Sequence, residues 1–270
     1  MNLKIEDDFD LYRIADSGQC FRWEDLSGGV FRVLNGAYCL YVESLGNKEY
    51  SFSCGDDEFK TVWWDYFDLS ENYAGIRTRI DQEEDPFLWR AAQQEQGIRI
   101  LRQDPWEMLI TFIISQNKNI PAIRRSVEMI CECCGEEKLD CRGKAYHAFP
   151  DPVSLAALGE KELKDCRLGY RWSYVHEAAE AVAAGNLSLE GLRNVNEEAT
   201  IRDLMALKGV GIKVASCVSL FGLHHVDAFP QDVWVKRVIE NEYPQGYPFE
   251  RYSPYNGIYQ QYMFAYYRNK

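Results

Sequence analysis

Lys213 and Asp232 are the two residues whose types and spacing best suit covalent chemistry. A lysine amine becomes a nucleophile only when it is desolvated or when a nearby base relieves it of its proton. A carboxylate nineteen residues later, in Pro230-Gln231-Asp232, is placed to do this at the start of the next predicted helix. Two simpler interpretations remain open at this point: Asp232 as a helix N-cap and Lys213 as a solvated lysine that binds phosphate.

A glycine-rich turn directly precedes this lysine. Leu204 and Leu207 end one predicted helix, Gly209-Val210-Gly211 reverses the chain, and a second helix begins near Ile212. Backbone amides at such a helix N-terminus bind an anion without reading sequence. We therefore predict a helix-hairpin-helix over about 199–223, which by itself supports only sequence-independent DNA binding. On its second helix, Lys213 and Cys217 are four residues apart and share one face, so both are expected to point into a cleft.

The charge distribution bears on the DNA-binding hypothesis. The chain of 270 residues has a formal net charge of −12, which argues against a nucleic-acid partner because DNA affinity depends on Lys and Arg. The first hundred residues hold 10 Lys and Arg against 20 Asp and Glu, and so carry −10 of that charge. The remaining residues hold 20 against 22, so a DNA-binding face is expected in the C-terminal part.

The hydrophobic pattern changes its period along the chain. Four segments between 19 and 55 alternate apolar and polar residues, as strands do, and Asn35-Gly36 between two of them predicts a hairpin. Later segments have helical spacing, and Asp85-Pro86 and Asp104-Pro105 are typical helix starts; Glu107 is placed to reach back to the second cap. We expect an α+β protein: an N-terminal antiparallel β domain with flanking helices over 1–98 and a mainly helical region over 99–270.

Other sequence signals exclude several classes. A hydrophobic content of 46% predicts a folded core, and no apolar run approaches the ~20 residues of a membrane span. The nine cysteines include Cys131, Cys133, Cys134 and Cys141, yet no paired CxxC or histidine set completes a metal site. We therefore expect reduced thiols, no metal and no cofactor. The aromatic run 63–67 is expected in the core of the N-terminal part.

Several separated blocks resemble the 8-oxoguanine DNA glycosylase family of the helix-hairpin-helix base-excision superfamily. The blocks are GQCFRW, RQDPWEMLITFIISQNKNI, LGYRWSYV, LKGVGIKVASC, PQDVW and PYNGIYQQYMFAYY, in the family's order and over nearly the whole chain. The resemblance implies a small β domain related to the TATA-binding-protein fold, followed by a helical body with the active-site cleft between its parts.

Positions that match the family's motifs imply residue roles. Lys213 resembles the Schiff-base nucleophile and Asp232 the essential acid. The base pocket implied by the resemblance has a cysteine and a phenylalanine on either side of the extruded base, an amide at its Watson–Crick edge, and a glycine carbonyl that accepts its N7–H proton. These four residues are Cys217, Phe264, Gln260 and Gly18.

The polar stretch 115–119 interrupts the apolar pattern, and the resemblance gives it a role. Asn117, Tyr170 and Arg171 resemble the residues that invade the duplex and contact the orphaned cytosine. Two positions depart from animal and fungal members: Ala122 stands where they have an arginine, and Trp234 replaces a histidine that contacts a phosphate. The missing arginine predicts relaxed discrimination of the opposite base.

Together these signals predict a bifunctional DNA glycosylase and AP lyase that excises 8-oxoguanine from duplex DNA. The alternatives are a related glycosylase for another damaged base and a non-catalytic helix-hairpin-helix protein that only binds DNA. We expect an intracellular protein, cytoplasmic or associated with a bacterial nucleoid. It is also expected to act as a monomer without a membrane or an obligate protein partner.

Overall fold

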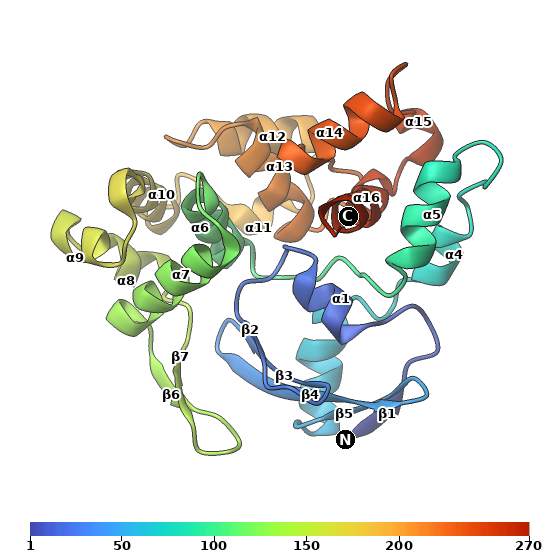
Figure 1. The fold of residues 1–270 in the computed structure, drawn as a ribbon. Coiled ribbons are helices and arrows are strands. Elements are labelled where there is room, and N and C mark those ends of the chain that lie inside the picture. The colour runs from blue at the N-terminus through green and yellow to red at the C-terminus, as the bar shows by residue number, and fades with distance from the viewer. Residues whose placement is uncertain (270) are drawn as a thin grey trace.

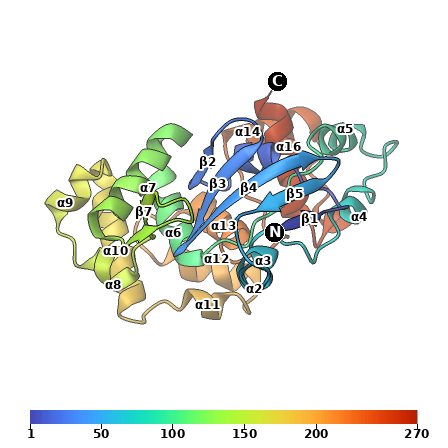
Figure 2. The ribbon, with the colours of Figure 1, turned by 90° about the horizontal axis from the view of Figure 1, so that it is seen from below.

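The computed structural model describes residues 1–269, and its N-terminal part is built on an antiparallel sheet. The sheet has five strands in the order β1-β5-β4-β3-β2, with all neighbouring pairs antiparallel. Figure 2 shows the sheet and the helices around it. The strands are β1 (Asn2–Lys4), β2 (Trp23–Asp25), β3 (Val30–Asn35), β4 (Tyr38–Gly46) and β5 (Glu49–Phe52).

The predicted hairpin joins β3 to β4, with the turn one residue later than expected. Asn35 pairs with Tyr38, so the two turn residues are Gly36 and Ala37 rather than Asn35 and Gly36. Gly36 has φ +54°, which a glycine adopts without steric cost. The sequence alternation therefore predicted the strands, whereas the pairing register decided the turn. β1, near the chain start, and the short helix α1 (Leu11–Asp16) were not predicted.

Short helices complete the N-terminal region, and the aromatic run is helical. Trp63, Tyr66 and Phe67 are buried in a cluster with the sheet, as expected, whereas Trp64 is 39% exposed. Leu69, Tyr73, Ile76 and Ile80 have helical spacing, and the helix that forms over this stretch is the short α4 (Tyr73–Arg77). The elements are α2 (Asp56–Glu58), the π-helical turn η1 (Phe59–Trp63), α3 (Trp64–Tyr66), α4 (Tyr73–Arg77) and α5 (Pro86–Gln94).

A helical body follows, and Figure 1 shows it above and beside the sheet. It also contains a short hairpin, β6 (Glu137–Leu139) and β7 (Ala145–His147), that the sequence reasoning missed. Its first helices are α6 (Pro105–Ser115), α7 (Ile120–Cys134), α8 (Pro152–Ala156), α9 (Glu160–Asp165), the 3-10 turn η2 (Gly169–Arg171), α10 (Trp172–Ala183) and α11 (Leu189–Leu192). The remaining helices are α12 (Glu197–Met205), α13 (Ile212–Phe221), α14 (Val233–Glu242), α15 (Phe249–Tyr252) and α16 (Asn256–Arg268).

The predicted helix starts are confirmed, with one difference in detail. Asp85 caps α5 by accepting from the Leu88 amide, and Asp104 caps α6 by accepting from the Glu107 amide. The Glu107 side chain does not return to this cap. It is buried near the backbone amide of Gly36 in the β3–β4 turn.

The hydrophobic interior falls into two clusters. The smaller cluster lies between the sheet and the short helices packed against it, and the larger cluster occupies the helical body. Tyr73, Ile76 and Leu88, from α4 and α5, belong to the larger cluster although they precede residue 98. The two helices thus pack with the body, and α16 lies against both α5 and α14. The domain boundary at residue 98 stays a prediction.

Candidate active site

The two helices α12 and α13 are joined by the predicted glycine-rich hairpin. Gly209 has φ +77°, and a Cβ there would lie 2.3 Å from the Tyr174 ring on α10. Only glycine meets both demands, positive φ and close approach. Gly211 has an extended conformation and begins α13 without a side chain that could cap its first amides. Val210 between them is buried, which anchors the hairpin to the core.

One cavity collects the six residues expected in the catalytic and base-binding sites. The space between its walls, with the solvent at its open mouth included, is about 350 Å³. The walls come from α6, α13, α16 and the segments before α14 and after α1. The lining residues are Ser17, Gly18, Phe112, Lys213, Cys217, Phe221, Pro230, Asp232, Gln260, Gln261 and Phe264.

Lys213 and Asp232 share this cavity from two different helices. The Lys213 amine lies over the Phe112 ring, 5.6 Å from its centroid. Asp232 caps α14, with Oδ1 accepting from the Val235 amide at 2.8 Å. Asp232 is therefore a helix N-cap, as the simpler interpretation predicted. Because the same residue also lines the cavity, the cap is compatible with a catalytic role. The cap fixes the carboxyl group in position at the helix start.

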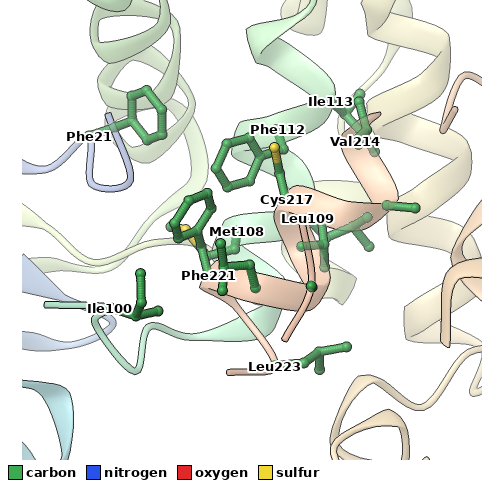
Figure 3. Packing of buried hydrophobic residues seen from close by; sticks show 14 of the residues in the cluster. Phe21, Ile100, Met108, Leu109, Phe112, Ile113, Val214, Cys217, Phe221 and Leu223 are labelled. Carbon is green, nitrogen blue, oxygen red and sulfur yellow. The ribbon is translucent and has the colours of Figure 1, made fainter. Parts of the chain in front are cut away.

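Cys217 provides a neutral wall of the cavity. The residue is 3% exposed, and burial raises the pKa of its thiol to about 11, with the nearby Lys213 amine acting in the opposite direction. The thiol is therefore protonated at neutral pH. Figure 3 shows Cys217 projecting toward the Phe112 ring, and the Phe112 and Phe221 rings stack with centroids 5.6 Å apart. Flat, apolar surfaces of this kind suit a planar heterocycle.

Gly18 lies beside Phe264, 246 positions away in the chain. It has φ +77°, and a Cβ there would lie 3.2 Å from the Phe264 ring. The fully buried side chain of Gln19 holds the loop in place. Its Oε1 accepts from the Leu101 backbone amide at 2.8 Å, and its Nε2 donates to the Arg99 carbonyl at 2.7 Å. The Gly18 backbone is thus fixed at the cavity wall.

Gln260 projects into the cavity from α16. Its Nε2 donates to the Pro230 carbonyl at 3.0 Å, and the residue is 3% exposed. The sequence reasoning missed its neighbour Gln261, as well as Phe112, Phe221, Pro230 and Ser17. Two consecutive glutamines in an otherwise aromatic and apolar helix were a usable signal. The aromatic and proline walls carried no signal, because their side chains are typical of any core.

The residues expected to invade the duplex form a separate group. Asn117 lies in the α6–α7 loop with φ +51°, and its Nδ2 donates to the Tyr170 hydroxyl at 3.2 Å. Tyr170 is 51% exposed. Arg171 is different: it is buried, with its guanidinium over the Tyr170 ring and donating to the carbonyls of Gln116 and Leu168. In this structure Arg171 holds the loop that carries Asn117.

The two departures from the family pattern lie on the first turns of helices. Ala122 is in the first turn of α7, where its amide donates to the Asn119 cap at 3.0 Å. Trp234 is half-buried in the first turn of α14, and the Arg237 guanidinium lies 5.1 Å from the centroid of its ring.

Residues 1–269 contain no metal-binding cluster, no disulfide and no helix that could span a membrane. No group of three His, Cys, Asp or Glu side chains in this range could hold a metal ion. All nine cysteines are free thiols. None of the helices described is long and apolar enough to cross a membrane.

Comparison with known proteins defines the class and then the family. Residues 110–244 match the family described as "HhH-GPD superfamily base excision DNA repair protein". The fold is that of the helix-hairpin-helix base-excision superfamily. Residues 2–109 match the "8-oxoguanine DNA glycosylase, N-terminal domain". The chain belongs to the 8-oxoguanine DNA glycosylase family, as its sequence blocks predicted.

Individual relatives agree with this assignment. The N-glycosylase/DNA lyase of Saccharomyces cerevisiae is 36% identical over 202 residues, which are 70% of this chain and 53% of that protein. The Arabidopsis thaliana enzyme of the same name is 36% identical over 234 residues, 83% and 64% of the two chains. The chain thus spans about half to two thirds of the length of these relatives. A Clostridium acetobutylicum 8-oxoguanine glycosylase/lyase, solved with DNA containing cytosine opposite 8-oxoG, superimposes with a TM-score of 0.91 at 33% identity. That alignment covers 100% of this chain and 98% of the other.

Proposed function

We propose that the chain is a bifunctional DNA glycosylase and AP lyase that excises 8-oxoguanine from duplex DNA. The observation that carries the proposal is the cavity in which Lys213 and Asp232 meet the base-pocket residues. The relatives named N-glycosylase/DNA lyase support the same pair of activities. The structure solved with 8-oxoG opposite cytosine supports the substrate.

The proposed reaction begins with extrusion of the damaged nucleotide, because C1′ is inaccessible in the stacked duplex. Extrusion costs a few kcal/mol, which binding in the cavity offsets. The neutral Lys213 amine attacks C1′, the C1′–N9 bond breaks, and its electron pair leaves with the base, which is then protonated. The Asp232 carboxylate stabilises the positive charge that develops on the sugar.

The lyase step follows from the covalent intermediate. The C1′–O4′ bond breaks, and its electron pair and a proton go to O4′. The Lys213 nitrogen forms a protonated imine with C1′, and its positive charge makes the C2′ proton acidic. Loss of that proton to a base is followed by cleavage of the C3′–O3′ bond, which nicks the strand 3′ to the lesion. The bond that holds the enzyme to the DNA is finally hydrolysed.

Recognition of the oxidised base is assigned to four residues. The Gly18 carbonyl accepts from N7–H, a proton that guanine lacks. Cys217 and Phe264 enclose the two faces of the ring, and Gln260 bonds the Watson–Crick edge. One hydrogen bond of this kind distinguishes the two bases by about 1–3 kcal/mol, or roughly 5- to 150-fold. Rejection of the far more abundant guanine therefore also needs the insertion and chemical steps.

DNA contacts outside the cavity are assigned to two surfaces. The hairpin Gly209-Val210-Gly211 would hold a phosphate at the N-terminus of α13. Asn117, Tyr170 and Arg171 are assigned to the gap left in the duplex and to the orphaned cytosine. Of these, Arg171 would have to exchange its bond to the Gln116 carbonyl for one to the base.

The decisive experiment is a single-turnover assay on a duplex with one 8-oxoguanine, with and without sodium borohydride. We expect base excision, strand nicking and a covalent adduct trapped by reduction of the imine. Lys213→Gln should bind the duplex and yield none of the three. Excision by wild type without any trapping, together with an active Lys213→Gln, would refute the nucleophile assignment. DNA binding without excision would instead indicate a non-catalytic protein.

Discrimination of the opposite base is a second test of the proposal. Ala122 has no side chain that could reach the orphaned cytosine, so we expect excision of 8-oxoguanine opposite C, A, G and T with relaxed preference. Ala122→Arg should raise the preference for cytosine. A strict cytosine requirement in the wild type would contradict the proposal.

The cellular setting is also proposed. We propose that the protein acts as a monomer without an obligate protein partner, because one chain supplies all six residues assigned to catalysis and base binding. We also propose that the protein acts inside the cell, in the cytoplasm or with a bacterial nucleoid, because its proposed substrate is duplex DNA. Sedimentation analysis with and without duplex DNA would check the stoichiometry.

A further inference from the structure

Gln261 is a buried polar residue at the cavity for which the proposed reaction has no use. It lies on α16 directly after Gln260, is 3% exposed, and lines the same cavity. Its Nε2 donates to Oε1 of Gln260 at 2.9 Å. Its own Oε1 is buried without a hydrogen-bond partner among residues 1–269.

The bond between the two glutamines is unusual for a helix. Consecutive residues on a helix point about 100° apart, so their side chains do not normally meet. Both amides must therefore turn toward each other inside the protein. A buried amide pair with one unpartnered oxygen is costly to maintain, which indicates a purpose other than stability.

The contacts fix the orientation of the Gln260 amide from both ends. Its Oε1 accepts from Gln261, and its Nε2 donates to the Pro230 carbonyl at 3.0 Å. Rotation of the amide by 180° would bring Nε2 against the Gln261 NH₂ and Oε1 against the Pro230 carbonyl oxygen. In the observed orientation one N–H of Nε2 and one lone pair of Oε1 remain for a ligand.

The remaining donor and acceptor have a definite order, and purine edges differ in that order. A guanine-type edge presents the O6 acceptor next to the N1–H donor. An adenine-type edge presents the N6–H donor next to the N1 acceptor. A fixed amide can match one of the two edges in a given pose, whereas an amide free to rotate can match both.

We propose that Gln261 is a specificity-determining residue that locks the Gln260 amide, so that the cavity accepts guanine-type and rejects adenine-type oxidised purines. It acts through Gln260 and is a positioning residue. The inference rests on the proposed function, because Gln260 must read the base edge. The unpartnered Gln261 oxygen is the consequence of turning its NH₂ group toward Gln260.

The test compares single-turnover excision of 8-oxoguanine and 8-oxoadenine, each opposite cytosine, by wild type and Gln261→Met. Methionine has a similar volume and cannot donate a hydrogen bond. We expect the ratio of the 8-oxoguanine rate to the 8-oxoadenine rate to fall fivefold or more, which corresponds to the loss of one buried hydrogen bond. A ratio of rates does not depend on the fraction of folded protein, so partial misfolding leaves the result interpretable.

Gln261→Glu gives a readout that a merely structural role would not move. A carboxylate faces the Gln260 oxygen unfavourably, whereas a protonated carboxyl group can donate to it as Gln261 does. The ratio of the 8-oxoguanine to the 8-oxoadenine excision rate in this variant should therefore rise toward the wild-type ratio at the same pH as the pH falls. Tyr262→Phe is the matched control, because the Tyr262 hydroxyl is buried on the same helix without a partner among residues 1–269.

The outcomes separate the two proposals. A wild type that excises neither base overturns the proposed function before any variant is measured. A wild type that excises 8-oxoguanine, with Gln261→Met and Gln261→Glu at the wild-type ratio, overturns the role of Gln261 alone. A drop in the ratio for Tyr262→Phe equal to that for Gln261→Met would also refute it, since the effect would then be general packing.

Discussion

The cavity and the Asn117–Tyr170 surface are two parts of one DNA-facing protein, and they are built in opposite ways. Cys217 and Gln260 in the cavity are each 3% exposed, and the Gln260 amide is bonded at both ends. Asn117 is exposed in a loop, and Tyr170 is 51% exposed. One region is held by packing, whereas the other presents side chains to the outside.

The difference follows from what each region is proposed to do. A reacting carbon must meet its nucleophile within a few tenths of an ångström, which requires groups fixed before the substrate arrives. Side chains that enter a duplex must adapt to a gap that exists only after extrusion. Residues on loops suit the second task.

Tyr174 on α10 connects the two regions. Its ring meets the Tyr170 ring edge-on with centroids 5.9 Å apart. The same ring occupies the place where a Cβ of Gly209 would lie. The Tyr174 ring thus contacts both the hairpin that positions Lys213 and the surface that carries Tyr170. A substitution that displaces this ring should affect both regions, whereas a substitution elsewhere in one region should affect that region alone.

Asp232→Asn should have the largest effect. Asparagine caps a helix as well as aspartate, so we expect an unchanged melting temperature. The loss of charge removes stabilisation of the developing cation, and excision should fall about 10²- to 10⁴-fold. Single-turnover rates and thermal melts measure both. Near-normal excision would reduce Asp232 to a cap alone.

Gly209→Ala should disturb both regions at once. The left-handed conformation costs about 1–2 kcal/mol for a residue with a Cβ, and collision with Tyr174 adds to it. We expect a lower melting temperature and about tenfold weaker binding to undamaged duplex DNA. Gly211→Ala is the matched control for the melting temperature, because a Cβ there meets nothing within 4 Å and φ is negative. It is no control for DNA binding, since Gly211 belongs to the proposed phosphate site. Equal losses of melting temperature in the two variants would rule out the Tyr174 contact as the cause.

Tyr170→Ala should affect the open surface alone. A lost ring that fills the gap in the duplex weakens damaged-DNA binding by about 1 kcal/mol, roughly fivefold. Borohydride trapping at saturating protein should remain efficient, because the cavity is intact. Binding titrations and trapping yields separate the two effects. A loss of trapping at saturation would show that the regions are coupled more tightly than the contacts indicate.

Glu107→Gln should leave both regions unchanged and alter only the dependence of stability on pH. Burial raises the pKa of the Glu107 carboxyl group to about 7, from an ordinary value of 4.5. The folded state therefore binds more protons than the unfolded state between about pH 4.5 and 7, and this group's contribution to stability falls as the pH rises through that window.

Glutamine has nearly the same shape as glutamate, keeps an amide oxygen that can face the Gly36 amide, and cannot ionise. The unfolding free energy of the variant minus that of the wild type should thus rise by on the order of 1–3 kcal/mol between pH 4.5 and 7 and stay constant above pH 7. Melting temperatures of the two proteins over this pH range measure the difference. A difference independent of pH would show that Glu107 titrates normally in the folded protein. Unchanged excision at pH 8 is the control.

Much of the local structure could be predicted from the sequence. Alternating residues gave the strands, and Asp85 and Asp104 gave two helix starts that the structure confirms. These signals work because caps and pleats depend on neighbours within a few residues. Glu107 shows the limit: the capping pattern was present, yet the side chain turned to Gly36 because the sheet packs there.

Residue types and motif order by themselves determined the family, and they predicted the chemistry, an amine and a carboxylate after a glycine-rich hairpin. Only the tertiary structure decided that Gly18 lies against Phe264 and that Arg171 is buried. It also decided that Gln261 turns inward to Gln260. Such arrangements depend on the packing of segments up to 246 positions apart, and no periodicity within a single segment encodes them.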